Sequence, residues 1–239
     1  MAGPYSEQAY IPQQKWQTVS RALASDIWID KPQEPKMPRC GVLKVPDLLL
    51  APIREHIKGE SETLREELRF LDRASIKKHT CILREYLCER LHVSDIPVEH
   101  GIACHPPGLE TVTVNDKTGH FIGMHLDSWD GDSYEERNLA RTRVSVNIGP
   151  STRSFLFISL PLCEIAKLIA KATGQCSLTH AHTIMPMVFQ MFPDIPVYRI
   201  ELNPGEAYIA DTDNLLHDGS SISSNSATLH YTLRAKLKI

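Results

Sequence analysis

Residues 202–221 read LNPGEAYIADTDNLLHDGSS, and this stretch decides the fold. Asn, Pro and Gly together signal a turn. In the EAYIAD that follows, Ala207 and Ile209 face one side of a strand while Tyr208 faces the other. The segment runs on to His217, which Asp-Gly follows at once. The pattern therefore predicts a turn and a strand that delivers a histidine to its end.

Short extended segments lie on both sides of this stretch. They are rich in β-branched and aromatic residues, several alternate cleanly, and Gly, Pro, Asn or Asp separates them. Many short strands of this kind predict a double-sheet jelly roll or a barrel that shields its own edges. The segments are GLETVTVND (108–116), RTRVSVNIG (141–149), RSFLFISL (153–160), VYRIEL (197–202) and SATLHYTLRAKLKI (226–239).

Amphipathic patterns precede and interrupt these strands. In residues 55–92, leucine and isoleucine recur at helical spacing while charges fill the other faces, which predicts supporting helices. LPLCEIAKLIAKATG predicts a helix that ends at Gly174, and MPMVFQMF a short second one. Residues 1–40 are polar and carry several prolines, which predicts a loop or a loosely attached arm.

The fold class that follows is α+β. Helices at the N-terminal side would pack on a β-rich core that spans residues 96–239. With 239 residues, of which 42% are hydrophobic and 23% charged, the chain has an ordinary globular composition. We expect a single domain over residues 1–239.

The charge balance and the cysteines argue against several classes of partner. Lys and Arg number 26 and Asp and Glu 29, so there is no basic excess to follow a phosphate backbone, and nucleic acid is not an expected partner. No apolar run approaches the roughly 18 residues of a membrane span. The six cysteines form no C-x-x-C pair, which predicts reduced thiols in a cytoplasmic protein. The sequence does not indicate an oligomeric state.

GMHLDSWDG, residues 123–131, supplies a histidine and a carboxylate two positions apart. In an extended segment, residues i and i+2 point to the same side, so His125 and Asp127 can both face the interior. With His217 they give two imidazoles and one carboxylate, a facial triad that suits Fe(II) and leaves positions for an organic acid and O2. The alternative is a strand-end turn in which His125 and Asp127 only hydrogen-bond each other.

A bound keto acid would need a cation for its distal carboxylate. Arginine offers a rigid donor fork that matches a carboxylate. We expect Arg234, assisted by Thr232 on the same face of the last strand, to grip that carboxylate. Arg143 and Asn147, on a polar face of RTRVSVNIG, are further candidates for contact with the cofactor. Arg143 or Arg153 is the reserve anchor, and the alternative for Arg234 is an exposed residue of the basic RAKLKI terminus.

The order of these features resembles one family. Helices, MHLDSW, a Pro-Gly turn before the distal histidine and an arginine on the final strand look like the Fe(II)/2-oxoglutarate-dependent dioxygenases over roughly residues 100–239. The resemblance implies a cupin-like double-stranded β-helix, with Fe(II), 2-oxoglutarate and O2 as cofactors. It also implies that His125, Asp127 and His217 bind iron and that Arg234 anchors the keto acid. Arg234 follows His217 at a greater distance than the arginine of many members does. Halogenating members replace the carboxylate ligand by a small residue, so Asp127 favours hydroxylation.

Residues that follow the ligand pair are candidates for substrate contact. Trp129, Asp130 and Asp132 are expected at the mouth of the barrel, where they can receive a cationic or amino group. The alternative is a solvated acidic loop. His105 in CHPPG is constrained by two prolines and is expected either to line the mouth or to belong to a structural loop.

The expected function is hydroxylation of an unactivated C–H bond in a small molecule, such as an amino acid or a natural-product intermediate, with succinate and CO2 as co-products. Two other classes stay open: a cupin-like metalloenzyme that uses no keto acid, and a metal-free jelly-roll binding module. THAH, with His180 and His182, offers an alternative pair of metal ligands. The competing interpretation of that segment is a loop or lid.

Overall fold

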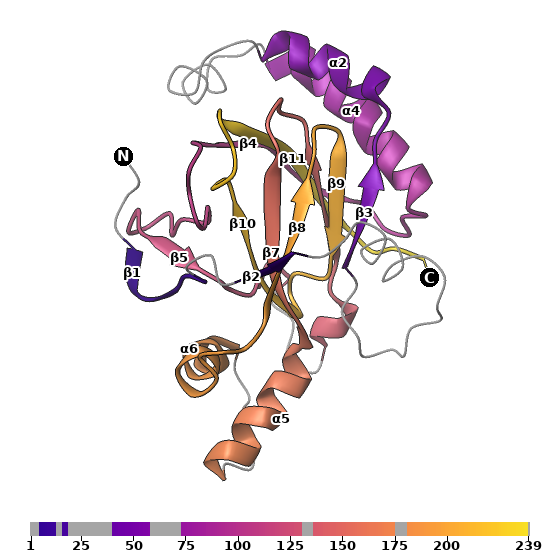
Figure 1. Cartoon of the computed structure of the whole chain (residues 1–239). Coiled ribbons are helices and arrows are strands. Elements are labelled where there is room, and N and C mark those ends of the chain that lie inside the picture. The colour runs from indigo at the N-terminus through magenta and orange to yellow at the C-terminus, as the bar shows by residue number, and fades with distance from the viewer. Residues whose placement is uncertain are drawn as a thin grey trace.

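A computed structural model describes residues 5–12, 16–18, 40–57, 73–130, 136–174 and 181–238. Two sheets face each other at its centre (Figure 1). The five-stranded sheet contains, in spatial order, β3 (Cys40–Lys44), β9 (Glu206–Ala210), β6 (Thr142–Asn147), β11 (Thr228–Ala235) and β4 (Val98–His105). The four-stranded sheet contains β10 (Leu215–Ser220), β7 (Arg153–Pro161), β8 (Val197–Leu202) and β2 (Trp16–Thr18). A further parallel pair joins β1 (Tyr5–Tyr10) to β5 (Phe121–Gly123).

Helices pack outside both sheets, along one face of the five-stranded sheet and toward one end of the four-stranded sheet (Figure 1). Two of them, α2 (Asp47–His56) and α4 (Arg73–Arg90), lie on the outer face of the five-stranded sheet. The other two, α5 (Leu162–Thr173) and α6 (Ala181–Met191), pack outside the four-stranded sheet. A short 3-10 turn, η1, spans Arg137–Leu139. The described part of the chain is thus a mixed fold of mostly sheet, as the sequence predicted.

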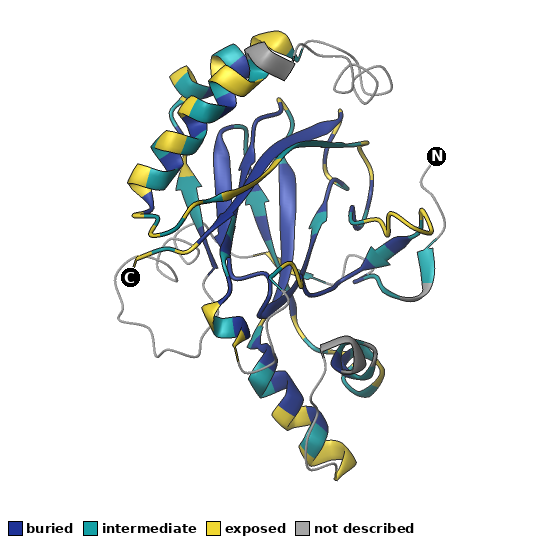
Figure 2. Cartoon of the chain, turned by 180° about the vertical axis from the view of Figure 1, so that it is seen from behind, coloured by how far each residue is buried: buried dark blue, intermediate teal, exposed yellow. Residues whose placement is uncertain are grey.

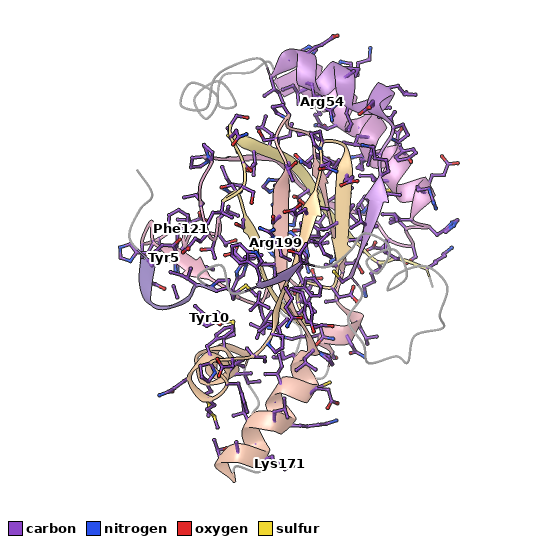
Figure 3. All side chains as sticks on the ribbon, viewed as in Figure 1. Tyr5, Tyr10, Arg54, Phe121, Lys171 and Arg199 are labelled. Carbon is purple, nitrogen blue, oxygen red and sulfur yellow. The ribbon has the colours of Figure 1, made fainter. Side chains whose placement is uncertain are left out.

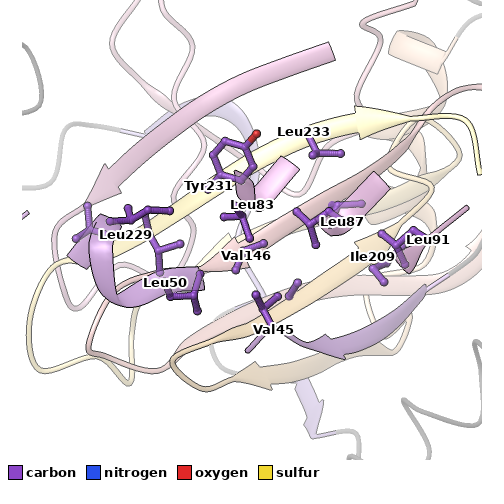
Figure 4. Close-up of a cluster of buried hydrophobic side chains, with 14 of the residues drawn as sticks. Val45, Leu50, Leu83, Leu87, Leu91, Val146, Ile209, Leu229, Tyr231 and Leu233 are labelled. Carbon is purple, nitrogen blue, oxygen red and sulfur yellow. The ribbon is translucent and has the colours of Figure 1, made fainter. Parts of the chain in front are cut away.

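Alternation along the strands of the five-stranded sheet separates two environments. Outward-facing Val146, Ile209 and Tyr231 are fully or almost fully buried against leucines of α2 and α4 (Figure 4). Full burial of one such apolar side chain stabilises the fold by about 1.5–3 kcal/mol. Tyr208 points the other way, into the space between the sheets. The alternation predicted for EAYIAD is therefore confirmed.

The space between the two sheets is filled by aromatic side chains toward one end. The Phe155 and Tyr208 rings, from opposite sheets, stack with centroids 4.1 Å apart. The inner strands of both sheets are buried along most of their length, whereas exposed residues lie on the outer surfaces of the helices, in loops and on the edge strands (Figure 2). Toward the other end the inner side chains become polar, and that region holds the candidate site.

The helix predicted to stop at Gly174 is confirmed as α5, because Gly174 adopts the left-handed conformation with φ 71° that ends a helix. The short helix predicted around MPMVFQMF is confirmed as α6, which begins earlier and includes His182. Residues 61–71, where part of the N-terminal helical pattern lies, fall outside the described residues. The second part of that pattern is confirmed as α4.

Several local predictions were wrong. Residues 108–116 form no strand beyond an isolated bridge at Val114. The segment is joined to residues 218–221 by side-chain hydrogen bonds and by two backbone hydrogen bonds at Ser221. The strand at EAYIAD does not run on to His217: a turn, closed by the Asn214 amide donating to the Asp211 carbonyl over 2.9 Å, separates two strands of different sheets. Helix α2 was missed because it contains Pro52, which normally breaks a helix.

The described parts of residues 1–40 are attached to the core. Met124 donates its amide to the Tyr10 carbonyl over 3.0 Å, and the Tyr10 ring stacks on Phe189 of α6 at 3.6 Å. Tyr5 and Phe121 lie together on the side of the molecule away from α2 (Figure 3). The prediction of a loose arm was therefore wrong for these segments. No helix of the described residues is both long and apolar enough to cross a membrane.

Candidate metal centre and cofactor cavity

Two strand segments from distant parts of the chain bring three side chains together. His125, just after β5, and His217, in β10, form an isolated antiparallel bridge in which each amide donates to the other's carbonyl, over 2.9 and 2.8 Å. The Asp127 amide donates to the Thr212 carbonyl over 3.1 Å. Because the backbones are joined directly, the distance between the two histidines is fixed by the sheet.

The three side chains converge on one point. The His125 Nε2 lies 3.8 Å from Asp127 Oδ1, and the His217 Nε2 lies 3.7 Å from Asp127 Oδ2. The Nδ1 atoms lie 2.9 Å from the carbonyl oxygens of Gly123 and Leu215 respectively. A carbonyl can only accept, so each Nδ1 carries the hydrogen and each Nε2 presents a lone pair to the centre.

The charges of the triad suit a cation. Burial lowers the pKa of His217 to about 3, against the opposing influence of Asp127. Burial alone would raise the pKa of Asp127, but Arg143 and the two histidines outweigh it, and the pKa falls below its usual range. At neutral pH the site therefore offers a neutral imidazole and a carboxylate. Among the described residues, no group hydrogen-bonds the buried Nε2 of His217.

Two arginines hold the carboxylate segment in place. Arg143 donates from Nη1 to Asp127 Oδ2 over 2.9 Å. Arg137 donates from Nη1 to the carbonyls of Asp127 (2.7 Å) and Asp213 (2.9 Å), and from Nη2 to the Ser128 hydroxyl (2.9 Å). Such contacts orient the ligands of a metal site. Arg137 was not singled out from the sequence, since it lies outside any strand pattern and its partners are backbone carbonyls.

A cavity of about 500 Å³ opens beside the triad, between the inner faces of the two sheets and the 112–116 segment. His217 contributes to its wall, and so does Arg153 at the start of β7. Its polar lining also includes Arg143, Tyr208, His230, His105, Thr113 and Asp116.

Arg153 is a buried guanidinium that makes no ion pair among the described residues, although nearby Asp218 favours its charged form. The residue is 4% exposed, and its Nη1 lies 3.4 Å from the Ser145 hydroxyl. The ion pairs found among the described residues involve Arg143 and Arg234 but not Arg153. Burial, assisted by nearby Arg143, lowers the pKa of Arg153 to about 10, so the guanidinium is still charged at neutral pH. A buried cation of this kind calls for an anion.

The structure gives Arg234 a different partner from the expected keto acid. Its side chain is 1% exposed, and Nη2 donates to Asp213 over 2.6 Å and to Asp130 over 3.2 Å. It does not line the described cavity. Because two carboxylates already pair with its Nη2 and the residue lies outside the cavity lining, the geometry favours Arg153 over Arg234 as the anchor.

Thr232 and Asn147 also form hydrogen bonds within the protein. The Thr232 hydroxyl donates to the Ser145 hydroxyl over 3.2 Å. The Asn147 amide nitrogen donates to the carbonyls of Ser151 (2.9 Å) and Leu202 (3.0 Å), which fixes the β6–β7 turn. The geometry therefore favours a structural role for Asn147. Thr232 is connected to the cavity wall through Ser145, whose hydroxyl lies 3.4 Å from Arg153 Nη1.

The residues expected at the mouth divide into two groups. Trp129 is 58% exposed, and His105 lines the cavity with its ring stacked 5.1 Å from that of His230. Asp130 is paired with Arg141 at 2.9 Å as well as with Arg234, so it is no free receptor for a cation. Asp132 and His180 lie outside the described residues. His182 belongs to α6 and not to a strand, and the position of its side chain is not described.

The sequence matches no protein-family model and no curated protein. Solved structures similar to the chain are those of the Kdo hydroxylase KdoO, a non-heme Fe(II) alphaketoglutarate dependent dioxygenase. Its complex with alphaketoglutarate and Fe(III) is 13% identical, with 98% of this chain and 90% of that chain covered and a TM-score of 0.47. The complex with succinate and Fe(III) is 14% identical, with 97% and 86% covered and a TM-score of 0.44. Because both TM-scores are below 0.5, the proposed function rests on the residues of the site.

Proposed function

We propose that this protein is an Fe(II)- and 2-oxoglutarate-dependent oxygenase that hydroxylates a C–H bond of a small molecule, such as an amino acid or a natural-product intermediate. One observation carries the proposal. Two backbone-oriented imidazoles and a carboxylate lie beside the same cavity as a buried arginine without a carboxylate partner among the described residues. A bound metal accounts for the two imidazoles and the carboxylate, and an organic dianion accounts for the buried arginine.

The residues of the triad fit iron(II). Two neutral nitrogens and one carboxylate oxygen on one side of a metal leave the remaining positions free, which is the ligand set of non-heme Fe(II) oxygenases. His125, Asp127 and His217 would hold the metal, and their donor atoms all lie within 4.8 Å of one another. The buried Nε2 of His217, which no described group hydrogen-bonds, supports this assignment because such an atom is costly without a partner.

The cavity fits 2-oxoglutarate in charge and in polarity. Arg153 would bind the distal carboxylate, with Ser145 and Tyr208 next to it. Arg143 would stay on Asp127 and keep that ligand ionised and oriented. His230 is held neutral, because burial lowers its pKa well below the usual value, so it can donate a hydrogen bond beside Arg153 without adding charge.

When bound, iron, 2-oxoglutarate and O2 would supply the oxidation, with succinate and CO2 as co-products. The protein would supply orientation and exclusion of water. The bridge between His125 and His217 fixes the metal, and Arg153 sets the direction of the keto acid. We also infer that the two facing sheets form a double-stranded β-helix. The strands β4, β6, β9 and β11 belong to one sheet and β7, β8 and β10 to the other, and the His125 bridge adds the segment after β5 to the second sheet.

Spectroscopy without oxygen tests the proposal. Anaerobic addition of Fe(II) and 2-oxoglutarate to the full-length protein is expected to give the weak visible charge-transfer band of a chelated keto acid, and admission of O2 is expected to give succinate. A cupin-like metalloenzyme would bind iron without the band, and a binding module would bind neither. Absence of both the band and succinate would contradict the proposal.

The anchor is tested with matched arginine variants. Arg153→Gln is expected to weaken 2-oxoglutarate binding about tenfold to hundredfold, because a hydrogen bond to a charged group contributes roughly 1.5–3 kcal/mol. Arg199→Gln, on the adjacent strand β8 and paired with Glu201, is the control and is expected to leave the titration of the band unchanged. If both variants are folded and Arg234→Gln loses more affinity for 2-oxoglutarate than Arg153→Gln, Arg234 and not Arg153 would be the anchor.

A further inference from the structure

The edge strand β4 carries an irregularity at His100, which lies near enough to the triad for Asp127 to influence its pKa. The partner of Thr232 in β11 is Gly101, whereas the next residue of β11 pairs with Glu99. His100 is therefore an extra residue, and Gly101 takes the positive φ of 81°. A bulge of this kind re-aims a side chain, and glycine supplies the left-handed conformation at little cost. The local sequence His-Gly thus turns His100 out of the ladder.

The bulge directs His100 onto Trp129. Their ring centroids lie 4.7 Å apart at an angle of 57°, within the range of attractive aromatic pairs. Trp129 follows the proposed ligand Asp127 by two residues, and 58% of its surface is exposed. We call His100 and Trp129 the ring platform. A single exposed tryptophan is common on protein surfaces. A bulge that positions a second ring against it indicates a specific role for the pair.

The charges around the ring platform favour some ligands over others. Burial lowers the pKa of His100, and Arg143 and Arg234 lower it further. Asp127 and Asp130 oppose them, but each is ion-paired to one of these arginines. The imidazole is thus neutral at physiological pH, and both nearby carboxylates are already paired with arginines. An ammonium group would find no free carboxylate there.

We infer that His100 and Trp129 form the substrate platform of the proposed oxygenase, and that it takes the flat face of a neutral or anionic ring in preference to a cationic group. The inference rests on the proposed function for its link to catalysis, but the binding surface is defined by this chain's own residues. Aromatic and sugar rings share the required chemistry, a ring face that packs on indole, and the experiment separates them.

Ligand-observed NMR on the full-length, Zn(II)-loaded protein measures binding to the platform. The probes are phenylacetate, 2-phenylethanol and 2-phenylethylamine, which differ mainly in charge, and methyl β-glucopyranoside as the sugar ring. The amine is expected to bind about tenfold more weakly than the acid. Trp129→Ala is expected to weaken the preferred probe about threefold to tenfold, the usual worth of an aromatic pair, and Trp129→Phe to restore most of it.

His100 has its own matched set of variants. His100→Ala is expected to weaken binding by a similar factor, and His100→Phe to restore it if the ring surface is what matters. Leu139→Ala removes another exposed apolar side chain, 65% exposed, and is expected to change nothing. Tighter binding of the amine than of the acid, or equal affinities in wild type, His100→Ala and Trp129→Ala, would overturn the inference.

The two proposals fail in different ways. A wild-type protein without the anaerobic charge-transfer band would contradict the proposed function alone, because the ring titration requires neither keto acid nor oxygen. A protein that shows the band, but in which Trp129→Ala does not weaken ring binding, would contradict the ring platform alone.

Discussion

A single residue, His217, shows how burial prepares a site for a metal. Its Nδ1 faces the Leu215 carbonyl, its Nε2 faces the triad, and the side chain is 2% exposed. The neutral imidazole that a metal needs is therefore the form that the fold itself requires. Protonation of His217 opposes folding, because a buried imidazolium would lie beside Arg143 with its solvation lost.

This residue predicts a pH dependence of stability in the metal-free protein. The pKa of His217 is about 3 in the folded state and about 6.5 in the unfolded state, so the unfolded state binds more protons between these values. Stability is therefore lost as the pH falls through this window. Between pH 7 and pH 5 the loss from this group is about 2 kcal/mol in the free energy of unfolding. Urea denaturation with a chelator present measures it.

Two variants at single histidines separate the effect of His217 from that of the other titratable groups. His217→Gln removes the buried imidazole and is expected to flatten the dependence by about that amount. His120→Gln, in the turn that follows Asn115, is expected to keep the wild-type slope. Equal slopes in wild type and His217→Gln would show that the buried imidazole does not control stability.

At the scale of an element, strand β10 and the residues after it act as a strap for the cavity wall. Asp218 accepts the Thr113 hydroxyl over 2.7 Å, the Ser220 hydroxyl donates to the Leu109 carbonyl over 3.0 Å, and Ser221 accepts the Leu109 amide over 3.1 Å. These bonds replace the strand pairing that the sequence suggested for residues 108–116. They hold the wall of the cavity against the strand that carries His217.

Gly219 completes this strap by leaving room. A Cβ added there would lie 2.8 Å from Val112 Cγ2, which would have to shift, and 3.0 Å from Arg153 Nη2, which would have to give by a few tenths of an ångström. Gly219→Ala is therefore expected to displace the anchor and weaken 2-oxoglutarate binding about tenfold, with a destabilisation of roughly 1–3 kcal/mol from overpacking. Titration of the anaerobic band and urea denaturation measure the two effects.

Ser220→Ala separates the anchor from the strap. It removes one bond between β10 and the wall without a new atom near Arg153, so it is expected to lower stability while the affinity for 2-oxoglutarate stays near that of wild type. If Gly219→Ala bound 2-oxoglutarate as tightly as wild type, binding would not depend on the present position of Arg153.

At the scale of the whole molecule, the sequence pattern predicted those features that depend on a single segment of the chain. The alternation in EAYIAD, the end of α5 at Gly174 and the candidate pair His125 and Asp127 are local patterns. The partner of an arginine is a property of the assembled fold. Arg234 and Arg153 look alike in sequence, and only the packing shows that Asp213 occupies the first while the second faces a cavity.

Other parts of the site could not be predicted from a sequence pattern. Arg137 binds backbone carbonyls, which every residue has, and the bulge at His100 depends on the register of a neighbouring strand. The strand predicted for residues 108–116 does not form, and side chains of the strap bind this segment instead of a regular strand partner. The single-domain organisation stays a prediction from length and composition.

Metal binding should stabilise the entire molecule, because the triad joins segments that are ninety positions apart, Asp127 and His217, and the unfolded chain has no such site. A ligand at a hundred times its dissociation constant adds about 2.7 kcal/mol, which for a chain of this size raises the Tm by about 5–10 °C. Thermal unfolding with Zn(II), Co(II) or anaerobic Fe(II) is expected to show this rise, and 2-oxoglutarate to add to it only when a metal is present. His125→Ala and His217→Ala are expected to abolish both shifts, whereas Arg153→Gln should keep the first and lose the second. A rise of equal size in His125→Ala would place the metal elsewhere.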